Sequence, residues 1–295
     1  MGDAQRLRSF SGDLGRLRGI YRAAGRELRR SLVAVDPANY SEVRAAAARA
    51  KAGEVVRTLN VAADRWALDA TRRAYGKSAR VARTSLRILG RVPRRKTWDD
   101  RPRRIADDTM VFLLRANGSI AGTVDRYLAA AAVATRAVAS AQVREYRFAD
   151  VEADVKKMAE RAVATEISHK ELAEEVRDHI YDLVGNDELV EIHCADGVVR
   201  TYKMADYAEL VGRYELGVAA TAATLDLCRE YENDLVQWSD HGTVCDECRP
   251  FEGNIYSISG NDPDYPPLEE EPPIHPNCEH ALLPTSREAI SVRGE

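Results

Sequence analysis

Apolar residues recur at helical spacing through the first 90 residues. Leu7, Leu14, Leu17 and Ile20 recur at helical spacings of seven, three and three positions, with arginines on the faces between them, which predicts an amphipathic helix. A second helix is expected from Ser41 after the break at Pro37, because the run that follows is rich in strong helix formers. One buried stripe is expected along it, formed by Val55, Val56, Leu59, Val61, Ala62, Trp66 and Leu68. We expect Gly76 to end this helix and a short helix over residues 78–89 to follow it.

Residues 90–104 contain two prolines and seven basic residues, a composition that predicts a loop or exposed linker. Helices are expected again over 105–184. The one around 120–147 is alanine-rich, which favours close helix–helix packing. The sequence Ser168-His169-Lys170-Glu171 has the pattern of a capping box, and predicts a helix that ends near Gly185.

The hydrophobic period then changes from helical to alternating. The runs 188–194 and 198–204 flank Asp196-Gly197, a strong hairpin signal. A helix over 205–233 and a proline-rich, loop-rich tail are expected next. The predicted fold is therefore mainly α with a C-terminal α+β domain: long N-terminal helices, one β-hairpin and a tail held by Cys and His. We divide the chain into a basic helical region (1–104), a helical region (105–184) and a C-terminal domain (185–295).

Charge is distributed unevenly along the chain. The formal net charge is −4, but residues 1–105 carry 26 Lys and Arg against 10 Asp and Glu, whereas residues 106–295 carry 17 against 37. Such asymmetry indicates that one end binds a polyanion or a partner subunit. Candidate contacts for nucleic acid, or for an acidic protein partner, are Arg72, Arg73, Arg94, Arg95, Lys96, Arg101, Arg103 and Arg104. Few aromatics lie among them, so base stacking is not expected.

Several classes of protein are not expected. The longest apolar stretches are too short for a membrane span, and the N-terminus lacks the apolar core of a secretory signal, so synthesis in the cytoplasm is the default. The sequence has no G-x-S-x-G, P-loop, H-E-x-x-H or G-x-G-x-x-G motif. Asp240-His241 beside Cys245 gives only weak support for a nucleophile and its base. We read the acidic run 269–271 as solvated loop.

The candidate chemistry lies in the last fifth of the chain. Cys245 and Cys248 have the C-x-x-C spacing of paired metal ligands, and His275 with Cys278 can supply a second pair. His280 competes for one of the four places. Zinc is the expected ion because it accepts mixed sulfur and nitrogen ligands, and a closed site would staple the tail.

Other interpretations of these residues stay open. The cysteines could be reduced, partly buried thiols in a tight turn, with His275 hydrogen-bonded in a loop. A redox role is less favoured, since the C-x-x-C does not open a helix after a βαβ strand. We read Cys194 and Cys228 as core residues.

Several motifs in one order resemble a known family. The segment 234–260, the run His275-Pro-Asn-Cys-Glu-His280, the hairpin at 196–200 and the stretch 207–215 together resemble the tailed-phage minor capsid protein 2 group, which is related to the Mu F-like head morphogenesis (minor head protein) family. The resemblance covers roughly residues 185–285. In relatives the position of His280 is often Cys or His, which raises His280 as a rival to His275.

The resemblance implies a virion protein and not an enzyme. It would be a minor structural protein near the portal vertex or in the capsid interior, acting in head assembly or in DNA packaging and delivery. Its partners would be the portal, the major capsid protein and possibly packaged double-stranded DNA, met by the basic N-terminal region. The alternative is an ADP-ribosyltransferase-like enzyme or toxin module derived from the same family, in which Arg213 and Glu215 would be relics or active residues. A redox or metal-binding regulatory module is a third, less favoured reading.

Overall fold

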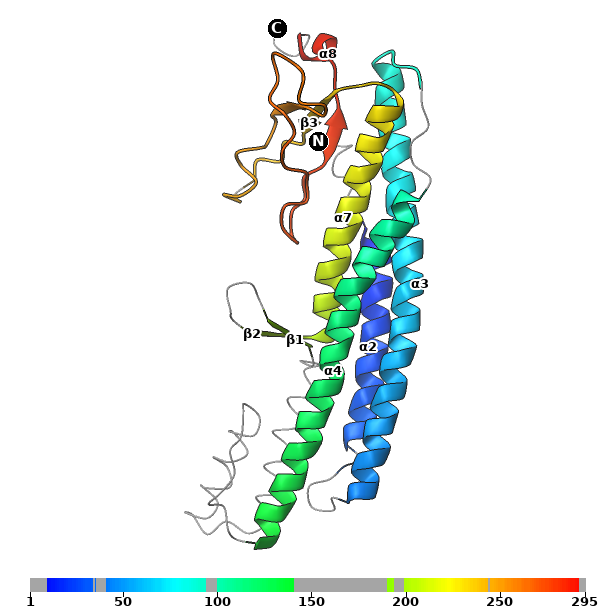
Figure 1. Cartoon of the computed structure of the whole chain (residues 1–295), viewed down its shortest axis with the longest axis vertical. Helices are drawn as coiled ribbons and strands as arrows, with labels where there is room; N and C mark the ends of the chain where they lie inside the picture. Colours follow the sequence, from blue (N-terminus) through cyan, green and yellow to red (C-terminus); the bar gives the residue numbers. More distant parts are fainter. Residues whose placement is uncertain are drawn as a thin grey trace. The chain divides into compact units, whose positions relative to one another are not determined.

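The computed structural model is mainly helical, with a small antiparallel sheet near the C-terminus (Figure 1). This confirms the predicted fold class. Four long helices are described, with bounds α2 (Ser11–Val33), α3 (Glu42–Ile88), α4 (Arg101–Ser140) and α7 (Met204–Glu230). The structure describes residues 10–33, 35, 41–93, 100–140, 190–193, 199–243 and 245–291.

Helix α3 runs without interruption through Gly76, so the predicted stop at Gly76 and the separate helix over 78–89 are wrong. A mid-helix glycine costs about 1 kcal/mol relative to alanine. Burial of Tyr75 and Ala79 on either side of it outweighs that cost. The helix ends instead at Ile88, and Gly90 just after it has a φ of 72°. There the N–H of Arg91 bonds to the carbonyl of Leu86, as in a Schellman cap.

Helix α4 begins at Arg101, so the linker predicted to reach residue 104 is shorter than expected. The carbonyl of Asp100 accepts bonds from the N–H groups of Arg103 and Arg104. Pro102 is tolerated because an N–H in the first turn of a helix has no intrahelical partner. The helix predicted around 120–147 is the later part of α4 as far as Ser140. The predicted capping box at 168–171 lies outside the described residues.

The chain divides into two compact units, each assembled from separate segments. One consists of residues 1–17, 64–112 and 209–295, and the other of residues 18–63 and 113–208. The division of the sequence at residues 104 and 184 stays a prediction. None of the helices in the described ranges is both long and apolar enough to cross a membrane.

The unit that contains the C-terminus joins helix to sheet. Side chains of α3 (Tyr75, Leu86), α7 (Leu227) and the sheet (Trp238, Leu282) share one core. In the same unit α7 approaches closely at Gly212, where an added Cβ would lie 2.8 Å from Trp66 and 2.9 Å from Leu17. Only glycine permits this approach.

The sheet in this unit has the order β4-β3-β5 and is antiparallel throughout. Its strands are β3 (Leu235–Trp238), β4 (Ile255–Ser257) and β5 (Leu282–Pro284), and the short helix α8 (Arg287–Ser291) follows. The sequence predicted a loop-rich tail here. The sheet is a correction to that prediction: the loop with Cys245 and Cys248 lies between β3 and β4, and the loop with His275, Cys278 and His280 directly precedes β5.

The second unit contains the predicted hairpin. Strands β1 (Val190–His193) and β2 (Val199–Tyr202) pair antiparallel, with Val190 opposite Tyr202, which confirms the two predicted runs. The Asp196-Gly197 turn and Cys194 lie outside the described residues. The helix predicted after the hairpin over 205–233 is confirmed as α7.

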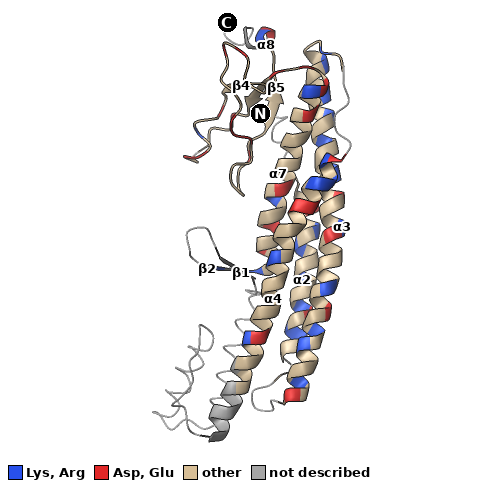
Figure 2. Ribbon diagram, viewed as in Figure 1, with Lys and Arg blue, Asp and Glu red and all other residues tan. Residues whose placement is uncertain are grey.

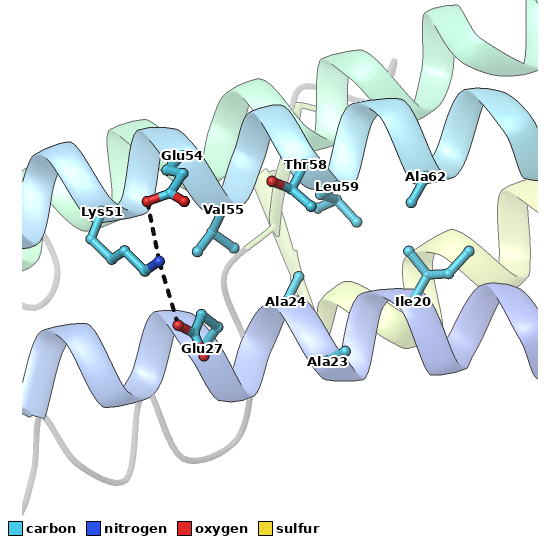
Figure 3. Close-up of a pocket in the computed structure, with 10 residues that line it drawn as sticks. All are labelled: Ile20, Ala23, Ala24, Glu27, Lys51, Glu54, Val55, Thr58, Leu59 and Ala62. Atoms are coloured by element: carbon cyan, nitrogen blue, oxygen red, sulfur yellow. Dashed lines mark hydrogen bonds and ion pairs between the residues drawn. The ribbon is translucent and has the colours of Figure 1, made fainter.

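A groove of about 470 Å³ lies between α2 and α3 in the second unit (Figure 3). Small and aliphatic side chains such as Ala23, Ala24 and Val55 line it. At one end the Nζ of Lys51 lies 3.6 Å from Glu27 and 3.1 Å from Glu54.

Candidate metal centre

The central strand β3 brings two loops together. The first follows β3 and carries Cys245 and Cys248, and the second precedes β5 and carries His275, Cys278 and His280. Ser239, directly after β3, donates its N–H to the carbonyl of Ala281, while its Oγ accepts from the N–H of Ala281, both at 2.9 Å. Antiparallel pairing of β3 with β5 therefore fixes the two motifs side by side.

The Cys245–Cys248 segment is shaped by local hydrogen bonds. The Oγ1 of Thr243 accepts from the N–H of Cys245 at 3.1 Å. The carbonyl of Cys245 accepts from Arg249, and that of Cys248 from Phe251, both at 3.0 Å. These bonds fold residues 245–248 into a turn. Such a turn allows two sulfurs three positions apart to face one metal ion.

All five predicted ligands lie in one cluster, as two overlapping triads that share Cys248. In each triad the ligand atoms are within 4.8 Å of one another. In the first, Nε2 of His275 lies 3.3 Å from the Sγ of Cys245 and 3.0 Å from that of Cys248. In the second, Cys278 Sγ lies 3.8 Å from Cys248 Sγ and 3.6 Å from Nδ1 of His280. The cluster could hold a metal ion.

Burial makes the thiolate of Cys248 dependent on a nearby positive charge. Cys248, Cys278 and His280 are buried, whereas Cys245 and His275 are partly exposed. Burial, reinforced by the neighbouring thiols of Cys278 and Cys245, raises the pKa of Cys248. A bound cation reverses this effect, because it stabilises the thiolate that coordinates it.

Glu252 is a residue of the candidate site that the sequence interpretation missed. Its carboxylate accepts hydrogen bonds from the N–H of His241 at 2.8 Å, from that of Thr243 and from Nε2 of His280 at 3.0 Å. Burial acts to raise the pKa of Glu252, but these bonds lower it below its usual value. A carboxylate that binds the outer nitrogen of a histidine is the usual support for a metal ligand. The only hint in the sequence is an acid four residues after Cys248.

The cluster is joined to the hydrophobic core of its unit through aromatic rings. The fully buried Trp238 stacks on Phe251, with ring centroids 4.8 Å apart, and lies 5.7 Å from the ring of His280. Cys228, predicted as a core residue, is buried on α7 within the same core. The ligand-bearing loops therefore rest on packed side chains, which restricts their movement.

The residues considered for catalysis are engaged elsewhere. Nε2 of His241 lies 2.8 Å from the Oγ of Ser239, while Cys245 faces His275. Arg213 pairs with Glu209 at 2.8 Å and donates to the side chain of Asn277. Glu215 is buried, and that burial and the charge of Asp108 raise its pKa to about 7. The acidic run 269–271 is exposed, as expected of solvated loop.

The predicted basic contacts fall into three groups. Arg72, Arg103 and Arg104 are exposed on their helices. Arg73 is exposed but pairs with Asp13 at 2.7 Å, and Arg101 pairs with the buried Asp226 at 3.2 Å. The positions 94–96 lie outside the described residues. The guanidinium of Arg101 thus has a structural partner within the protein.

Comparisons of the chain with known protein families, curated proteins and solved structures find no match.

Proposed function

We propose that the chain is a minor structural protein of a tailed-phage head, located near the portal vertex or in the capsid interior, and not an enzyme. It would act in head assembly or in DNA packaging and delivery, with the portal, the major capsid protein and packaged DNA as partners. One observation carries the proposal. The five Cys and His residues within the resembling motifs converge on one cluster, which supports reading those motifs as a single structural unit.

We propose zinc as the ion of this cluster. The donors are thiolates and imidazoles, the set that zinc prefers. Two sulfurs about 2.3 Å from a tetrahedral zinc lie about 3.8 Å apart, which is the separation of Cys248 and Cys278. When bound, zinc would crosslink the two loops. The two loops consist largely of proline, glycine and charged residues, with few apolar side chains. Such a crosslink would therefore stabilise their fold.

The zinc proposal is tested by elemental analysis of the purified full-length protein. We expect about one zinc per chain, and a loss of that zinc in Cys245→Ser. Cys228→Ala is the matched control, because Cys228 is a cysteine of the same unit that lies in the core, and its zinc content should equal that of the unmutated chain. Protein without zinc after purification in the absence of chelators contradicts the assignment.

The structural role is tested on particles. Quantitative mass spectrometry of heads purified before and after DNA filling should find the chain in few copies relative to the major capsid protein. Deletion of its gene should reduce the yield of infectious particles. If the chain is absent from both kinds of head, the proposed function is wrong whatever the protein's zinc content.

A further inference from the structure

The second half of α3 carries a row of basic side chains along one face, which we name the α3 basic stripe: Arg73, Lys77, Arg80 and Arg87. At 100° per residue these positions lie within about 40° of a common line, and they span about 21 Å along the helix. The sequence contains no Asp or Glu between Asp69 and Asp99. Figure 2 shows blue Lys and Arg positions along α3.

A groove of about 470 Å³ runs beside the beginning of this stripe. Its charged lining consists of Arg72, Arg73, Lys77 and Arg80 against the single acid Asp13. Asp13 already pairs with Arg73 and with Arg16, so the groove keeps a positive charge. Gly76 lies in the lining and would have no atom within 4 Å of an added Cβ, which leaves open space beside the helix backbone.

We propose that the α3 basic stripe and this groove bind the phosphate backbone of double-stranded DNA; the proposal rests on the proposed function, in which the chain is near packaged DNA. Guanidinium groups suit phosphate because they form paired, charge-assisted hydrogen bonds. A row of cations along a helix suits a row of phosphates better than it suits a single carboxylate group.

The aromatic and apolar residues beside the groove argue against other partners. Phe10 and Tyr75 are buried, so they offer no surface on which the bases of a single strand could stack. A protein partner usually inserts apolar anchors into a pocket, but the apolar lining residues Phe10 and Ala74 are both buried. A duplex held by its backbone, without base-specific contacts, fits the surface best.

The stripe differs from the contacts expected from sequence. Lys77, Arg80 and Arg87 come from the interior of a helix and were not expected, whereas Arg101 belongs to the predicted set but is paired with the buried Asp226. We therefore expect Arg101 to contribute to folding, and the stripe to contribute to binding.

The experiment measures binding of the full-length protein to a fluorescent duplex of arbitrary sequence over a range of salt concentrations. The slope of log K against log salt reports about 0.9 per phosphate contact. Combining Lys77→Gln, Arg80→Gln and Arg87→Gln should reduce the slope by about 3 and weaken binding at low salt by about tenfold or more. Circular dichroism confirms that the variant is folded.

A second variant places one negative charge in the groove without disturbing packing. Gly76→Glu should weaken duplex binding, because its side chain enters open space beside Arg72, Lys77 and Arg80. Gly118→Glu on α4 is the matched control: it makes the same substitution at another helical glycine with no atom within 4 Å, and should leave binding unchanged.

Three results would overturn this inference. They are an unmutated protein that does not bind duplex at low salt, a combined variant that keeps the original affinity and slope, and purified portal protein that competes for the stripe more strongly than duplex does. Each of them leaves the zinc content and the presence of the chain in heads unaffected. Conversely, a chain that binds DNA in a salt-dependent way but is absent from heads would support DNA binding by the stripe and refute the proposed function.

Discussion

The carboxylate of Glu252 accepts a hydrogen bond from Nε2 of His280 at 3.0 Å, and the other ring nitrogen, Nδ1, faces the Sγ of Cys278 at 3.6 Å. The proton on Nε2 is held by the carboxylate, so Nδ1 keeps its lone pair on the side of the sulfurs. The same carboxylate accepts from the N–H of Thr243, two residues before Cys245. Glu252 thus links the two loops that carry the ligands, and it positions His280.

Glu252→Gln is expected to lower the affinity for zinc by about 10- to 100-fold, the usual effect of removing the outer partner of a ligand. The amide cannot supply the charge that fixes the ring of His280. Competition against a chromogenic chelator measures the change. Glu247→Gln is the control, since Glu247 is an exposed acid of the same loop. If both variants bind zinc like the unmutated chain, the positioning role of Glu252 is excluded.

Cys248 belongs to both triads, and its loss should therefore be the most damaging change in the cluster. Cys248→Ser is expected to abolish stoichiometric zinc binding and to lower the melting temperature more than His275→Ala or His280→Ala, because each histidine belongs to only one triad. Elemental analysis and thermal unfolding at a fixed zinc concentration test this ranking. Full zinc content in Cys248→Ser would show that neither triad holds the ion.

The elements that could be predicted from the sequence are those stabilised by residues close together in the chain. The long helices and the hairpin follow from local periodicity and from Asp196-Gly197, signals contained within short windows. The strands of the C-terminal sheet are three or four residues long and gain stability by pairing with distant residues, such as Gln237 with Leu283. A short window of sequence does not contain that information.

The candidate site shows the same contrast. The spacings of Cys245 with Cys248 and of His275 with Cys278 are local, so the candidate ligands could be predicted. Glu252 acts on His280, 28 positions away, and becomes apparent only once β3 and β5 are paired. Gly76 was misread for a related reason: its intrinsic cost is local, whereas the packing of its neighbours that offsets the cost is tertiary.

Glu215 should make the stability of the protein depend on pH. Burial, together with the charge of Asp108, raises its pKa to about 7 in the folded chain, above the value of an unfolded glutamate. The folded state therefore binds more protons between these two values, and its stability falls as pH rises through this interval. The loss is at most about 3.5 kcal/mol, at 1.4 kcal/mol per unit of pKa.

The comparison that isolates Glu215 is denaturant unfolding of the unmutated chain and of Glu215→Gln from pH 5 to pH 8, at constant zinc. We expect the difference between their free energies of unfolding to change steadily between pH ~5 and ~7, in favour of the variant as pH rises. A difference that stays constant over this interval would show that Glu215 is not protonated in the folded protein.

Gly212 sets the distance between α7 and its neighbours, and replacing it should destabilise the fold. An alanine Cβ would lie 2.8 Å from Trp66 and 2.9 Å from Leu17. The packed rings and methyl groups have to move, at a cost of about 1–3 kcal/mol. Gly118→Ala provides the control, because its Cβ meets no atom within 4 Å; we expect it to stabilise α4 by up to about 1 kcal/mol. Thermal unfolding should therefore shift in opposite directions for the two variants. An unchanged or raised melting temperature for Gly212→Ala would mean that close approach at Gly212 is not required.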